Sequence, residues 1–173
     1  MSAPRVSVVV PAFDEQAVLA AHLAAIDSHC EAVGLDHELI VVDDGSSDDT
    51  RSIAERVAAE RSRVRVVALD ENRGLGGALR AGFGAASAPL VVTLDADLTY
   101  APEHIERLVA ACDDTVAVVV ASPYAPGGRV SGVPRHRLVL SRWANRLLAR
   151  RTGLATSTSM VRGYDREFLN AAL

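Results

Sequence analysis

Two carboxylates one residue apart carry the strongest chemical signal in the sequence. Asp95 and Asp97 follow the apolar run 90–94, which is typical of a strand buried in a parallel sheet. Because buried carboxylates are costly when unpaired, we expect both at the strand's end, where open α/β sheets bind ligands. Together they can bind one hard cation, Mg²⁺ or Mn²⁺, along with substrate phosphates. The alternative is a helix-capping turn, with Pro102 as the first helical residue.

The first predicted strand also leads into acidic residues. Residues 5–10 contain four valines, and Asp14 and Glu15 follow them at the start of a helix expected over about 15–31. Acidic side chains are favoured at a helix N-terminus, and capping alone would explain these two.

A second buried strand, residues 38–43, is followed directly by Asp44. A carboxylate at this position can accept hydrogen bonds from a nucleobase or a ribose, since the ends of such strands contact ligands. Ser47 or Asp48 can cap the next helix, which we expect to continue to about Arg61.

The rest of the first two thirds repeats the alternation of strand and helix. We expect a third strand, a close-packed glycine-rich helix, the fourth strand, a further helix and a fifth strand. The respective ranges are 63–69, 77–84, 90–94, 102–112 and 116–121. Because each connection is a helix, the sequence predicts an α/β fold with a mainly parallel sheet and helices on both faces.

Composition narrows the possible functions. The 173 residues favour one domain, and lysine is absent, which excludes a Walker phosphate loop and a Schiff-base enzyme. Cys30 and Cys112 have no metal-ligand or redox spacing, so we expect reduced thiols in a cytoplasmic protein. No apolar window approaches the roughly 18 residues that span a bilayer, and we expect no signal peptide.

Charge divides the chain unevenly. Residues 1–122 carry a net charge of −11 and residues 123–173 a net charge of +7. A Pro- and Gly-rich loop over 122–134 precedes a predicted basic helix over 135–151, which contains six arginines and Trp143. Such helices commonly lie on membrane surfaces, so we expect this end to face something anionic; the alternative is a solvated helix surface.

Six motifs in order resemble family 2 glycosyltransferases with the GT-A fold. Within that family the sequence is most similar to the polyprenol-phosphate sugar transferases, such as dolichol-phosphate mannose synthase. The resemblance covers essentially the whole chain and implies a single GT-A catalytic domain over 1–173. Residues 1–122 would bind the nucleotide sugar, and residues 123–173 would face the acceptor and the membrane. The motifs are residues 8–15, 41–50, 72–78, 94–98, 122–128 and 140–145.

The resemblance implies a role for each matching position. Asp95 and Asp97 would bind Mg²⁺ or Mn²⁺ against the donor diphosphate, while Arg137 and Ser141 would bind the acceptor phosphate. Asp95, Asp97 and Arg137 would act in catalysis. The residues expected to contact the nucleotide are Pro11, Phe13, Glu15, Val42, Asp44, Asp95, Ala96 and Asp97.

The implied reaction is inverting transfer of a sugar from a GDP- or UDP-linked donor to a polyprenyl phosphate, at the cytoplasmic face of a membrane. Three positions depart from the family pattern. Thr99 replaces a common Gln, Thr156 a common Asp, and Pro123 a phosphate-facing Arg for which Arg129 is the candidate substitute. These departures concern the acceptor and the sugar rather than the metal ligands.

Two alternatives remain. A family 2 transferase with a soluble or glycan acceptor would need a general base for a hydroxyl nucleophile, and the candidates are Asp165 and Glu167. A nucleotide-sugar-binding module without turnover would bind nucleotide and metal but form no glycolipid.

Overall fold

The computed structural model describes residues 5–97, 100–112, 115–122 and 159–173. The chain divides into two compact units, one of residues 1–119 with 161–173 and one of residues 120–160. All the helices described here lie in the first unit. In the second unit, the described residues are 120–122 and 159–160.

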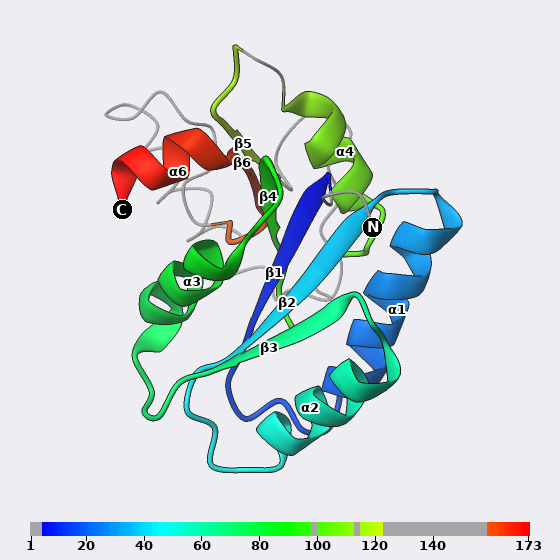
Figure 1. Cartoon of the computed structure of the whole chain (residues 1–173), viewed down its shortest axis with the longest axis vertical. Coiled ribbons are helices and arrows are strands. Elements are labelled where there is room, and N and C mark those ends of the chain that lie inside the picture. Colours follow the sequence, from blue (N-terminus) through cyan, green and yellow to red (C-terminus); the bar gives the residue numbers. More distant parts are fainter. Residues whose placement is uncertain (1–4, 98–99, 113–114, 123–158) are drawn as a thin grey trace, which may run out of the picture. The chain divides into compact units, whose positions relative to one another are not determined.

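A six-stranded sheet has the order β3-β2-β1-β4-β6-β5 (Figure 1). The four strands β3, β2, β1 and β4 are parallel, whereas β6 is antiparallel to β4. Every residue of β2 is buried, including the polar His37, Glu38 and Asp43, and its apolar centre over 39–42 is typical of an inner strand. The strands are β1 (Val6–Ala12), β2 (His37–Asp43), β3 (Val64–Ala68), β4 (Leu90–Thr93), β5 (Val118–Val120) and β6 (Arg162–Asp165).

The strand order requires helices on both faces of the sheet. The connections β1–β2 and β2–β3 step one way across the sheet, and β3–β4 steps back past β1. Since parallel crossovers are right-handed, this reversal puts α3 on the face opposite α1 and α2. The helices are α1 (Leu19–Ala32), α2 (Thr50–Glu60), α3 (Gly74–Ala85), α4 (His104–Ala111) and α6 (Arg166–Ala172). The mainly parallel α/β fold is therefore confirmed.

Glycines let helices approach the sheet closely on both faces. A Cβ on Gly82 of α3 would lie 2.3 Å from Val9 Cγ1 and 3.1 Å from Val42 Cγ2. A Cβ on Gly163 of β6 would lie 3.4 Å from the Leu108 Cβ of α4. Because the Gly82 contact is closer than real Cβ atoms approach a neighbour, the close packing predicted for the glycine-rich helix is confirmed at Gly82.

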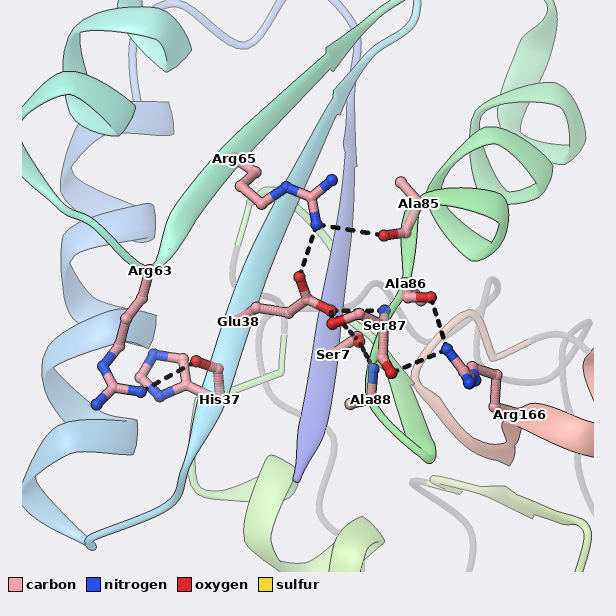
Figure 2. Close-up of polar contacts among 10 residues, drawn as sticks. All are labelled: Ser7, His37, Glu38, Arg63, Arg65, Ala85, Ala86, Ser87, Ala88 and Arg166. Atoms are coloured by element: carbon pink, nitrogen blue, oxygen red, sulfur yellow. Dashed lines mark hydrogen bonds and ion pairs between the residues drawn. The ribbon is translucent and has the colours of Figure 1, made fainter. Parts of the chain in front are cut away.

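A buried carboxylate organises the amino end of the sheet (Figure 2). Glu38 accepts hydrogen bonds from Ser7 Oγ at 2.6 Å, from Ser87 N and Oγ at 2.7 Å each, and from Arg65 Nη1 at 2.9 Å. Burial alone would raise the pKa of Glu38, but the hydrogen bonds outweigh it and lower the pKa below its ordinary value. This cluster ties β1, β2, β3 and the segment before β4 together.

One local prediction was wrong, and one strand was not predicted. Helix α1 begins at Leu19 rather than Glu15, because residues 16–18 form a turn in which the Glu15 carbonyl accepts hydrogen bonds from Val18 N and Leu19 N. The antiparallel strand β6 was not expected. Its sequence, Arg-Gly-Tyr-Asp, has no β-branched residue, and pairing with β4 supplies what its intrinsic preference lacks.

Candidate donor-binding and metal site

The carboxyl ends of β1, β2 and β4 meet at one edge of the sheet. The strand order reverses between β1 and β4, and Thr93 pairs with Val9 in the parallel register. The Leu94 N–H also bonds the Val9 carbonyl at 3.0 Å, so Asp95 emerges beside β1 immediately beyond the pairing. Such a switch point is where open α/β sheets bind ligands.

The two predicted metal ligands stand at this edge. Asp95 is half-buried and Asp97 is exposed. Burial, and then the neighbouring charge of Asp97, raises the pKa of Asp95 above its ordinary value. Among the described residues, no hydrogen bond or ion pair to the Asp95 carboxylate offsets these two effects. A divalent cation between the two carboxylates would outweigh both effects and lower the pKa of Asp95.

The donor set fits Mg²⁺ or Mn²⁺ when a substrate completes it. Within the described ranges, no group of three or more His, Cys, Asp or Glu residues could hold a metal ion. Two carboxylates alone suit a cation that keeps several waters and shares phosphate oxygens with its substrate. The residues present therefore fit a nucleotide-dependent metal site better than a permanent structural one.

A histidine from α1 bonds the turn between the two aspartates. His22 Nδ1 lies 2.6 Å from the carbonyl oxygen of Ala96. Since that oxygen only accepts, Nδ1 carries the proton and donates it. The peptide linking Ala96 to Asp97 is thereby attached to a helix 74 residues earlier in the chain.

The loops after β1 and β2 hold each other through reciprocal hydrogen bonds. Asp14 N donates to Ser46 Oγ at 3.1 Å, and Ser47 N donates to Asp14 Oδ1 at 2.9 Å. Glu15 N donates to Thr50 Oγ1 at 2.7 Å. Asp14 has a φ of 54°, a left-handed conformation that aspartate tolerates better than most residues. The acids of this loop therefore join two loops at the site's edge.

Asp44 is buried and holds a third loop. Its N–H bonds the Ala12 carbonyl at 2.9 Å, and its Oδ1 accepts from Arg73 N at 2.8 Å. The next residue, Gly45, has a φ of 68°, and a Cβ there would lie 2.5 Å from the backbone carbon of Glu71. Only glycine fits both conditions without movement. A carboxylate has further acceptor positions, so the predicted nucleotide contact of Asp44 is compatible with this bond.

The other residues predicted for the nucleotide pocket differ in exposure. Phe13, just beyond β1, is 45% exposed, whereas Val42 is fully buried in β2. Pro11 and Glu15 are half-buried, and Ala96 is buried between the aspartates. Their contacts with a nucleotide remain predictions.

The predicted acceptor residues lie outside the described residues. These are Arg129, Arg137 and Ser141, together with the basic segment 135–151. The same holds for the family departures at Thr99, Pro123 and Thr156.

Sequence reasoning missed two features of the site. No sequence pattern predicts the hydrogen bond from His22, because a single histidine is common on an amphipathic helix. The register that pairs Arg162 with Thr93 brings an arginine beside the carboxyl end of β4, and it depends on a strand that was not predicted. Both features arise from contacts between residues about 70 positions apart.

The fold is of the GT-A type, as its similarity to two solved glycosyltransferase structures shows. A mannosyltransferase from Pyrobaculum calidifontis, solved with GDP-Man and Mn²⁺, superposes with a TM-score of 0.69 at 24% identity, over 99% of this chain and 47% of its own. Glucosyl-3-phosphoglycerate synthase from Mycobacterium tuberculosis, solved with Mn²⁺, UDP and phosphoglyceric acid, superposes with a TM-score of 0.69 at 27% identity, over 96% and 57%.

Residues 7–172 match glycosyl transferase family 2, and the chain belongs to that family. A curated relative, the undecaprenyl-phosphate 4-deoxy-4-formamido-L-arabinose transferase of Klebsiella pneumoniae, is 39% identical over 172 residues. The match covers 98% of this chain and 51% of the relative, so the chain spans about half the length of the curated relatives it matches. The family predicted from the six motifs is therefore confirmed.

Proposed function

We propose that this chain binds a nucleoside-diphosphate sugar with Mg²⁺ or Mn²⁺ and transfers the sugar with inversion to a polyprenyl phosphate. The observation that carries the proposal is the Asp95–Asp97 pair at the switch point of a family 2 fold. The Mn²⁺ and nucleotide in the two related structures support a cation-assisted donor site.

In the proposed reaction the aspartates hold the cation and the loops hold the donor. A divalent cation, when bound, stabilises the negative charge that develops on the leaving diphosphate. Phe13 and Asp44, on the coupled loops after β1 and β2, would contact the nucleotide. Because these loops are already hydrogen-bonded to each other, the pocket would be preorganised before the donor arrives.

The polyprenyl-phosphate acceptor is inferred from the curated relative named above and from the chemistry of the nucleophile. A phosphate oxygen is anionic at neutral pH, so it attacks without a general base. It would approach the sugar from the face opposite the leaving diphosphate, which inverts the anomeric centre. Arg137 and Ser141, with Arg129, would orient the phosphate, since a guanidinium matches its oxygens in a fork.

We place the acceptor part, residues 123–173, against the cytoplasmic face of a membrane. The support is its net charge of +7 and the predicted basic helix over 135–151. None of the helices in the described part of the chain has the length and apolarity that a bilayer crossing requires. We propose that residues 123–173 attach to the membrane surface through their basic side chains.

A soluble phosphorylated acceptor is the second candidate, favoured by the phosphoglyceric acid bound in the related synthase. A hydroxyl acceptor would need a general base, and the sheet register argues against Asp165, one of the two candidates. Asp165 pairs with Leu90, at the end of β4 opposite Asp95, and its Oδ1 accepts from Phe168 N at 2.8 Å as the cap of α6. Asp165 is therefore a poor general base, whereas Glu167, exposed on α6, stays a candidate base for an acceptor that attacks through a hydroxyl.

Transfer from labelled GDP- and UDP-sugars to undecaprenyl phosphate, and separately to 3-phosphoglycerate, tests the proposal. We expect a metal-dependent glycolipid product that disappears in Asp97→Ala and persists in Glu31→Ala, an exposed acid on α1. Product on 3-phosphoglycerate alone would favour the second candidate. Full activity of Asp97→Ala would refute the metal-site mechanism, and donor binding without any product would favour a binding module.

A further inference from the structure

We propose that His22 is a positioning residue that sets the angle between the two metal-binding carboxylates by holding the Ala96 carbonyl. The inference rests on the proposed function, because it concerns how Asp95 and Asp97 come to share a cation. The juxtaposition that carries it is the 2.6 Å contact between His22 Nδ1 and the oxygen of the only residue between them.

The geometry of the turn makes this bond consequential. Asp95 is fixed from its amino side, because Leu94 N–H bonds the Val9 carbonyl at 3.0 Å. Asp97 follows the peptide group that joins it to Ala96, and the carbonyl of that group belongs to Ala96. Rotation of that peptide would swing the Asp97 carboxylate relative to Asp95. The hydrogen bond from His22 opposes that rotation.

The helix that carries His22 is a firm support. His22 N bonds the Val18 carbonyl at 3.1 Å, and the neighbouring Leu19 and Leu23 are fully buried. The imidazole is thus attached to a helix packed on the core, while its donor atom reaches the turn. A metal site needs its ligands held within about 0.5 Å of the productive geometry, and a partner of this kind supplies that restraint.

The arrangement also opposes electrostatic repulsion. Asp95 and Asp97 repel each other while no cation lies between them, so the turn tends to open. A hydrogen bond to the intervening carbonyl keeps the pair together before the cation arrives. Removing it should weaken cation binding and leave the folded chain intact.

The test compares three variants for Mn²⁺ binding in the presence of GDP or UDP, measured by the electron paramagnetic resonance signal of free Mn²⁺. His22→Leu removes the donor, His22→Asn keeps an N–H donor near the place of Nδ1, and His29→Leu is the matched control. His29 lies on the same helix, but its Nε2 pairs with Glu106 at 3.0 Å, away from the turn. Circular dichroism and thermal unfolding check that each variant folds.

We expect His22→Leu to weaken Mn²⁺ binding on the order of tenfold, the lower end of the range for outer-shell partners. His22→Asn should stay within about threefold of the wild type, and His29→Leu should bind as the wild type does. Unchanged binding in His22→Leu, or an equal loss in His29→Leu, would overturn the inference while leaving the proposed function standing. Absence of Mn²⁺ binding in the folded wild type would instead refute both.

A measurement on the metal-free wild type needs no variant. In protein labelled with ¹⁵N-histidine, the ring nitrogens of His22 should show a proton on Nδ1 and a hydrogen bond to the Ala96 carbonyl. A proton on Nε2 alone would overturn the inference, since Nδ1 could not then donate. This readout keeps the proposal testable if His22→Leu does not fold.

Discussion

A buried acid, Glu38, stands at the amino end of this sheet and a half-buried acid, Asp95, at the carboxyl end, but their surroundings differ. At the amino end, Glu38 accepts four hydrogen bonds, and its pKa is lowered despite burial. At the carboxyl end, burial and Asp97 raise the pKa of Asp95, and no described residue offsets them. The described part of the fold thus supplies partners to the Glu38 carboxylate and supplies none that offsets the charge of Asp95. Under the proposed function, Glu38 is the structural acid of this pair and Asp95 is the functional one.

Removal of the structural acid should have the largest effect on stability. We expect Glu38→Ala to lower the free energy of unfolding by about 3 kcal/mol, because the buried Ser7 hydroxyl and the Ser87 N–H lose their acceptor. Urea unfolding at pH 7 measures it. The control is Glu55→Ala, which breaks only an exposed pair with Arg51 and should cost less than about 0.5 kcal/mol. Equal losses in the two variants would contradict the comparison.

At the carboxyl end, the backbone conformation and the close packing of the loops restrict which residues fit. Gly45 and Gly74 have nearly the same φ, 68° and 70°, but only at Gly45 would a Cβ strike backbone, at 2.5 Å from Glu71. We expect Gly74→Ala to cost about 1 kcal/mol and Gly45→Ala at least about 2 kcal/mol. Denaturant unfolding of both variants measures these losses of unfolding free energy. Similar losses would mean that the positive φ alone, and not the close packing at Gly45, sets the cost.

Neutralising Asp95 should have a small effect on the free energy of unfolding, opposite in sign to that of Glu38→Ala. We expect Asp95→Asn to leave the metal-free protein as stable as the wild type or more stable by about 0.5 kcal/mol, because it removes a half-buried charge that Asp97 repels. Thermal unfolding with chelator measures this effect. With nucleotide present, Mn²⁺ should raise the melting temperature of the wild type but not of the variant. A clear destabilisation of metal-free Asp95→Asn would show that Asp95 is structural.

The two acids also predict opposite contributions to the pH dependence of stability. The lowered pKa of Glu38 stabilises the protein above its unfolded value of about 4.5, and this contribution is lost as pH falls through the folded pKa. The raised pKa of Asp95 stabilises the folded protein below the unfolded value of about 3.8. This stabilisation is lost as pH rises through the folded pKa.

Unfolding free energies of the metal-free protein between pH 3 and pH 7 separate these contributions. Glu38→Gln should flatten the loss of stability toward low pH. Asp95→Asn should remove a smaller, opposite slope in the acidic range above pH 4. If Asp95→Asn flattened the curve in the same direction as Glu38→Gln, the assignment of Asp95 as an uncompensated acid would be wrong.

Much of this arrangement follows from local sequence. The apolar runs at β1, β2 and β4 have no strong alternative to buried strands, and aspartates directly after such a run must lie at its end. The remainder depends on contacts that join distant residues. Strand β6 pairs with Thr93 and Val91 of β4, and the Glu38 cluster joins residues 27 to 49 positions apart. Such pairings have no periodicity that a sequence pattern could show.

Calorimetric titration with GDP and with UDP, in Mn²⁺ and again after chelation, tests the central claim most directly. We predict that one of the two nucleotides binds only when the cation is present, and that Asp97→Ala loses this binding while it remains folded. Failure of the folded wild type to bind either nucleotide, or binding that chelation leaves unchanged, would contradict the account of Asp95 and Asp97 as the ligands of a donor-bound cation.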